Sequence, residues 1–198
     1  MQNRFLILVV FFSNLFFGEC NLNSNLLSNF FESNSSFQSE FIQVFEEKEK
    51  PNISGEILIK RPNHLKIYLK PPLNSELIIN QDYIFQTDFD LDQTIRYEKD
   101  AMIDFIPAGF LLLSKEEFCE GFIMDTCDNK ECVIRQKNND NKIEIFFKDL
   151  KIEQLNFSGP KYDETKILFG NMTLMNDINE SAFSYNQEVK DLLIIDKK

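Results

Sequence analysis

The segment Gly55-Glu-Ile-Leu-Ile-Lys-Arg-Pro-Asn-His-Leu-Lys-Ile-Tyr-Leu-Lys-Pro-Pro72 carries the clearest structural pattern in the chain, an alternation of apolar and polar residues. Residues two apart lie on one face of a β-strand, so this alternation predicts a sheet with one apolar face and one face toward water. The apolar face carries Leu65, Ile67 and Leu69, and the opposite face carries His64, Lys66, Tyr68 and Lys70. Proline donates no backbone hydrogen bond and keeps the preceding residue out of a helix. Arg61, which precedes Pro62, is therefore expected on extended backbone at a strand end.

Outward from this segment, the chain reads as a succession of short strands separated by turn residues. Strands are predicted at 35–45, 54–60, 64–70, 76–80, 83–87, 93–97, 121–127, 132–137, 142–148, 151–157 and 165–174. A further strand is expected through Leu192 to Ile195. About 11 sequential antiparallel strands predict a mainly β (α+β) protein with a strongly curved sheet.

Two regions are expected to be helical instead. Apolar residues at helical spacing between Leu22 and Phe31 predict a short amphipathic helix at 23–31. The 100–122 region lacks strand alternation, and Ser114 followed by acidic residues is typical of a helix start. These helices would cover the apolar face of the sheet, either as a solid core or as a lid over a cavity.

The first 20 residues have the features of a signal peptide. Arg4 supplies a positive charge, Phe5 to Phe17 is an apolar run, and Gly18 and Cys20 are small residues suited to cleavage. Residues 1–20 are therefore predicted to be removed, and residues 21–198 to form a single domain. Cys20 leaves open a lipid-anchored form, although Glu19 is unlike the small residue that normally precedes a lipidated cysteine.

The charge balance narrows the partners. The net charge is −11 at pH 7, and an acidic surface repels phosphate backbones and anionic head groups. We expect no binding to nucleic acid. Simple solubility explains the same charge.

Three cysteines follow residue 20, and two of them suggest a disulfide. Cys127 and Cys132 flank a four-residue segment that predicts a hairpin loop, so they can face each other across two strands and pair. Cys119 would then be a free thiol. Three unpaired cysteines packed as small apolar residues are the alternative.

Residues suited to catalysis are scarce. His64 is the only histidine, and no nucleophile motif, phosphate-binding glycine loop or metal-ligand spacing occurs. We therefore expect no enzyme activity, no metal and no cofactor. Phenylalanine, at 21 residues with no tryptophan, favours instead an apolar interior that binds a greasy ligand.

An ordered block of residues resembles one known family. Ile59 to Asn63 (Ile-Lys-Arg-Pro-Asn), Pro72 and the Asp90-Leu-Asp-Gln93 turn resemble the signature of LolA, the periplasmic carrier of outer-membrane lipoproteins. The similarity is dense over 36–95 and thin after about 115. It implies an unclosed half-barrel with helices as a lid, and a monomeric periplasmic chaperone that shuttles lipoproteins between membranes. The implied partners are acylated lipoproteins, an inner-membrane lipoprotein-releasing ABC transporter and an outer-membrane LolB-like acceptor.

The resemblance also assigns site residues. Arg61 falls on the family's arginine that latches the lid, by donating planar hydrogen bonds to lid carbonyls; a surface salt bridge is the alternative. The expected ligand-binding residues are Arg61, Leu65, Ile67, Leu69, Leu26, Phe110 and Leu111. Ile67 and Phe85 stand where the family usually has tryptophan, which keeps the positions apolar and alters ligand detail.

Two other functions stay open from the sequence. A LolB-like acceptor would share the fold and carry lipid on Cys20. A structural or sensor domain with the same fold would have a filled core and no lipid cargo.

Overall fold

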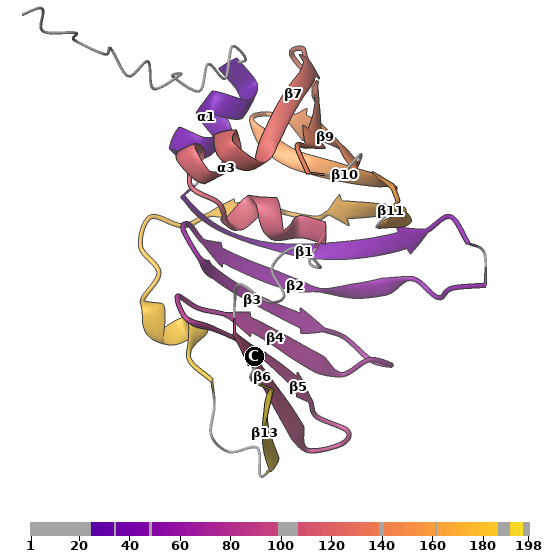
Figure 1. The fold of residues 1–198 in the computed structure, drawn as a ribbon, viewed down its shortest axis with the longest axis vertical. Helices are drawn as coiled ribbons and strands as arrows, with labels where there is room; N and C mark the ends of the chain where they lie inside the picture. The colour runs from indigo at the N-terminus through magenta and orange to yellow at the C-terminus, as the bar shows by residue number, and fades with distance from the viewer. Residues whose placement is uncertain are drawn as a thin grey trace, which may run out of the picture.

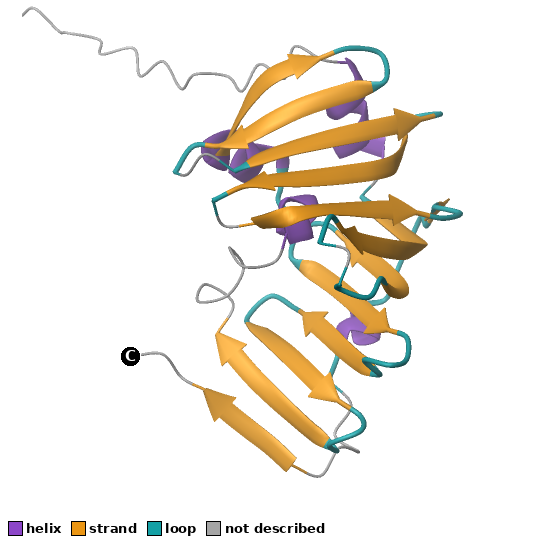
Figure 2. Ribbon diagram, turned by 90° about the vertical axis from the view of Figure 1, so that its right-hand side faces the viewer, coloured by secondary structure: helices purple, strands orange, loops and turns teal. Residues whose placement is uncertain are grey.

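The computed structural model describes residues 25–33, 35–47, 49–98, 107–138, 141–160, 162–185 and 191–195. The predicted signal peptide, residues 1–20, lies outside them. Within the described residues, 13 strands form one curved, unclosed sheet in the order β13-β6-β5-β4-β3-β2-β1-β11-β10-β9-β8-β7, and β12 pairs with β1 (Figures 1 and 2). The predicted mainly β half-barrel is therefore confirmed.

Most of the expected strands occur within one or two residues of their predicted bounds. The strands in the first half of the chain are β1 (Ser36–Phe45), β2 (Ile53–Lys60), β3 (His64–Leu69), β4 (Ser75–Ile79), β5 (Tyr83–Asp88) and β6 (Gln93–Glu98). The strands in the second half of the chain are β7 (Phe122–Cys127), β8 (Glu131–Gln136), β9 (Lys142–Lys148), β10 (Lys151–Gly159), β11 (Tyr162–Phe169), β12 (Thr173–Leu174) and β13 (Asp191–Ile195).

The described strands outnumber the expected 11 for two reasons. The predicted 165–174 strand is divided at Gly170 into β11 and β12, where the Gly170 amide donates to the Glu40 carbonyl. The strand expected at 192–195 also forms, as β13, and it pairs with β6 in parallel whereas the other described pairs are antiparallel.

The helical elements are α1 (Asn25–Ser33), the 3-10 turn η2 (Pro107–Leu112), α3 (Lys115–Gly121) and the 3-10 turn η3 (Glu180–Phe183). The first three lie in the two regions predicted to be helical. Ser114 caps α3: its hydroxyl accepts from the Glu117 amide at 3.1 Å while the Glu117 carboxylate accepts from the Ser114 amide at 2.8 Å. This reciprocal capping box satisfies two amides that the helix itself leaves free. Among the described residues, no helix is long and apolar enough to cross a membrane.

One face of the sheet packs against α1, η2 and α3. Leu27 and Phe30 from α1, Leu111 from η2 and Phe118 from α3 join the sheet residues in a single buried cluster. The register of β3 places Leu65 opposite Ile59 of β2 and Ile79 of β4, all three buried. The alternation in the sequence therefore predicted the inward face of β3 correctly.

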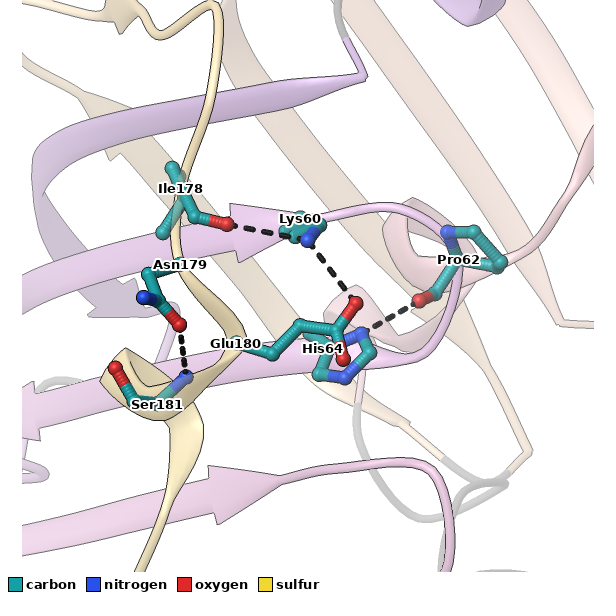
Figure 3. A network of polar contacts seen from close by, with 7 residues as sticks. All are labelled: Lys60, Pro62, His64, Ile178, Asn179, Glu180 and Ser181. Atoms are coloured by element: carbon teal, nitrogen blue, oxygen red, sulfur yellow. Dashed lines mark hydrogen bonds and ion pairs between the residues drawn. The ribbon is translucent and has the colours of Figure 1, made fainter.

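The opposite face of β3 was predicted to meet water, and this is wrong at the His64 end. The C-terminal segment around η3 lies on that face, where Ile178 and Phe183 pack with Ile78 and Phe85. The Lys60 ammonium donates to the Ile178 carbonyl and to the Glu180 carboxylate, both at 3.1 Å (Figure 3). The covering residues follow β3 by more than 100 positions, so the alternation within β3 carries no sign of them.

The cysteines differ in part from expectation. Cys127 and Cys132 lie opposite each other in the β7–β8 hairpin and are joined by a disulfide. The prediction that Cys119 is then a free thiol is wrong, because Cys119 is also disulfide-bonded. Spacing along the chain reveals a pair within one hairpin, but it did not indicate the bond of Cys119.

Candidate functional site

The six apolar residues proposed to line a ligand site converge on one cluster. Leu65, Phe110 and Leu111 are buried in it, and Leu26, Ile67 and Leu69 pack against it while partly exposed. They come from α1, β3 and η2, three elements that are separate in the sequence. The cluster therefore lies between the inward face of the sheet and the helices.

The turn between β2 and β3 ties both covering helical elements to the sheet. The Arg61 amide donates to the Ser35 carbonyl, just beyond α1, at 2.7 Å. Two residues later the Asn63 amide donates to the Leu112 carbonyl at the end of η2, at 3.1 Å. Asn63 has a φ of 70°, a left-handed conformation that asparagine tolerates better than most residues. One turn therefore fixes the ends of α1 and η2.

The Arg61 side chain adds a third tie. Its Nη2 donates to the Phe30 carbonyl in the last turn of α1 at 2.8 Å, and its guanidinium carbon lies 4.4 Å from the centre of the Phe30 ring and 4.8 Å from that of Phe31. Carbonyls in the last turn of a helix lack partners within the helix and carry its negative dipole end. A guanidinium there satisfies a free acceptor and also makes cation–π contacts.

Burial affects the charge of this group. Desolvation lowers the pKa of Arg61 from its ordinary value to about 10, because the interior solvates a positive charge less well than water does. The guanidinium is still protonated at neutral pH. A buried charge at this position makes the closed arrangement of α1 less favourable than the contacts alone indicate.

The contacts of His64 are those of a structural residue. The His64 Nδ1 lies 2.9 Å from the Pro62 carbonyl (Figure 3). The centre of its ring lies 5.3 Å from that of the Phe183 ring. His64 is on the outward face of β3, opposite to the apolar cluster. Within the part of the chain that the structure describes, no group of His, Cys, Asp and Glu side chains could hold a metal ion.

The family described as "Outer membrane lipoprotein carrier protein LolA" matches residues 32–186. The chain belongs to the LolA family. Curated members similar to it are the outer-membrane lipoprotein carrier proteins of Idiomarina loihiensis and Francisella tularensis subsp. novicida. The first is 23% identical over 163 residues, 81% of each chain. The second is 29% identical over 151 residues, 74% of this chain and 73% of the relative.

A solved structure supports the fold of this LolA-family chain. An uncharacterized conserved protein from Thermus thermophilus superposes with a TM-score of 0.54 at 9% identity, over 87% of this chain and 97% of its own. The helices of this LolA-family chain lie over the inward face of the sheet, as the resemblance implied (Figure 2).

No separate role was predicted for Phe30 and Phe31, which belong to the helical stripe expected near the start of the domain. In the structure both rings contact the Arg61 guanidinium, and Phe30 is 1% exposed. The helical spacing did place both residues on the packed side of α1, but nothing in it indicates that an arginine 30 residues later contacts them.

Proposed function

We propose that this chain is a periplasmic carrier that binds the acyl chains of lipoproteins between its sheet and its helices, and takes them from the inner to the outer membrane. The observation that carries the proposal is the convergence of α1, β3 and η2 on one apolar cluster beside Arg61. The family is described as a lipoprotein carrier, and both relatives are named as such, which supports the proposal.

The buried apolar cluster under the helices is suited to reversible binding of an acyl chain. Burying an acyl chain contributes about 0.8 kcal/mol per methylene, so a long chain would bind too tightly to leave a permanently open cavity. Here Leu27 and Leu111 are fully buried. An acyl chain must therefore displace α1 and η2, and the return of these helices to the sheet offsets part of the binding energy and favours release.

Arg61 is the proposed latch of this exchange. Its contacts with Phe30 and Phe31 exist only while α1 is docked. When α1 leaves, the guanidinium regains water, so opening relieves the desolvation that docking imposes. The contacts of the arginine and its desolvation therefore largely offset each other. Arg61 holds α1 in a defined position but stabilises the docked helix only slightly, so a ligand can displace it.

The partners belong to the proposal as well. Acylated lipoproteins are the cargo, an inner-membrane releasing ABC transporter is the donor and a LolB-like outer-membrane protein is the acceptor. The net charge of −11 keeps a carrier from adhering to anionic membrane surfaces. The proposed function is binding and transfer, with no covalent step.

The test uses the purified protein and a triacylated lipopeptide. Native mass spectrometry should show a complex with the lipopeptide and none with the same peptide without acyl chains. Hydrogen exchange should show α1 and η2 less protected in the complex, while β9 and β10 stay protected. Absence of the complex, or a complex in which α1 and η2 keep their protection, would contradict the proposal.

A further inference from the structure

A small apolar groove lies at the end of the sheet remote from Arg61, where the β1–β2 and β3–β4 loops meet. Its volume is about 230 Å³. Its lining consists of Phe45, Lys50, Pro51, Asn52, Ile53, Ser54, Lys70, Pro71, Pro72 and Leu73. Three prolines make this wall rigid, because their rings fix φ. The groove is thus open in this structure, whereas the cluster under the helices is buried.

Three neighbouring strands carry apolar rows that connect the two places. The rows are Phe37, Phe41 and Phe45 on β1, Ile59, Ile57 and Ile53 on β2, and Leu65, Ile67 and Leu69 on β3. On β1, Ser39 and Gln43 lie between the phenylalanines on the same face, whereas the rows on β2 and β3 contain no polar side chain. All three rows lie on the inward face, since residues two apart on a strand share a face. Figure 1 shows β1 and β2 extending beyond the helices toward their shared loop.

Exposure rises along these rows. Phe37 and Ile59 are 0% exposed and Leu65 is 1% exposed under the helices. Phe45 and Ile53 are half-buried at the groove. Leu73, at the outer end, is 42% exposed. Apolar side chains on β2 and β3 therefore lead from the groove to the buried cluster.

The charges at the groove favour an uncharged occupant. The Lys50 ammonium pairs with Glu47 at 2.8 Å. The Lys70 ammonium pairs with Glu40 at 2.9 Å and with Glu56 at 3.4 Å. Each lysine of the lining thus has a carboxylate of its own, and the rest of the lining carries no ionised side chain. A hydrocarbon chain matches this surface better than an acidic or basic peptide does.

We propose that this groove is the first contact site for a saturated acyl chain, which then advances along the rows on β1, β2 and β3 as the helices part. The inference rests on the proposed carrier function and adds a site to it. The acyl chain meets a preformed apolar surface before any helix has moved, so the first step buries hydrocarbon without disturbing the packed cluster.

The experiment compares Leu73→Glu with Leu91→Glu. Leu91 is 68% exposed on the neighbouring β5–β6 turn and does not line the groove, so the two variants gain the same charge on similar loops. The probes are a short peptide N-acylated with chains from octanoyl to palmitoyl, measured by calorimetry, and a palmitoyl version with a photoreactive group on the chain. Wild-type affinity should rise roughly fourfold per methylene.

The expected result is a loss of about tenfold or more in affinity for Leu73→Glu and little change for Leu91→Glu, with photoadducts on Phe45, Ile53 or Leu73. If the wild type binds the palmitoyl peptide and both variants bind it equally well, the groove assignment is overturned and the carrier function stands. If the wild type binds none of the acylated peptides, the carrier function itself fails. A wild-type dimer that Leu73→Glu dissociates would assign the groove to a second copy of the chain instead.

Discussion

Replacing Arg61 by lysine is expected to make the stability of the fold depend on pH above neutrality. Burial lowers the pKa of Arg61 to about 10, about 2.5 below the ordinary value for arginine, and a fall of this size corresponds to roughly 3 kcal/mol at 1.36 kcal/mol per pKa unit. A lysine begins from about 10.4 in the unfolded chain, so equal burial would bring its folded-state pKa to about 8.

In the Arg61→Lys variant, the folded state binds the side-chain proton less tightly than the unfolded chain does. With the folded-state pKa below the unfolded one, the full penalty applies below about pH 8, and stability rises as the pH passes from about 8 toward 10.4. The Arg61→Lys variant should therefore gain about 2 kcal/mol between pH 7 and pH 10, relative to a variant that cannot titrate. Wild-type Arg61 stays protonated through most of this interval.

Urea unfolding at several pH values measures the effect, with Arg61→Met as the matched control. The methionine variant cancels the other groups that titrate in the same range, so the difference between the two variants isolates position 61. Hydrogen exchange of α1, compared between the variants at each pH, locates the change. A difference that is flat from pH 7 to pH 10 would mean that the lysine reaches water, and would refute the idea that the docked helix forces a cation to be buried here.

Three further predictions concern the core, the sheet and the C-terminal segment. Leu111→Ala should lower the free energy of unfolding by about 2–5 kcal/mol because it opens a cavity in a fully packed site, whereas Leu91→Ala, at an exposed position, should change it by less than about 0.5 kcal/mol in the same urea titration. Gly55→Ala should cost about 1–3 kcal/mol, because an added Cβ would collide with the backbone of the neighbouring strand; Gly121→Ala, with open space around the Cβ, should be tolerated in thermal melts, and equal losses would contradict the packing argument. The ion pair with Lys60 lowers the pKa of Glu180, so η3 should keep its protection from hydrogen exchange as the pH falls to about 4 and lose it only below that, while loss of protection already at pH 6 would show that another group holds the segment.

Local chemistry explains how much of the fold could be predicted from the sequence. The capping box at Ser114 depends on two residues three positions apart, and the burial of Leu65 depends on alternation within one strand. Both could be predicted because the interacting groups are neighbours along the chain. The same holds for Cys127 and Cys132, which one hairpin brings together.

The parts that could not be predicted join distant segments. The outward face near His64 is covered because Lys60 binds residues about 120 positions later. The disulfide of Cys119 was not indicated by its position in the sequence either. The site residues were predicted largely from the resemblance to a family. The sequence pattern of an apolar stripe is the same whether the stripe packs in a solid core or lies under a lid.

The sequence alone predicts the inward face of the strands, the positions of the helices that cover it and the position of Arg61 at the end of a strand. Each of these follows from the period of side chains along an element or from a cap within one turn. In contrast, the sequence does not indicate that the Arg61 guanidinium meets the Phe30 carbonyl, or that apolar rows run from the groove to the cluster under the helices. These contacts depend on how the sheet curves and where each helix docks, which are set by the packing of all the elements together.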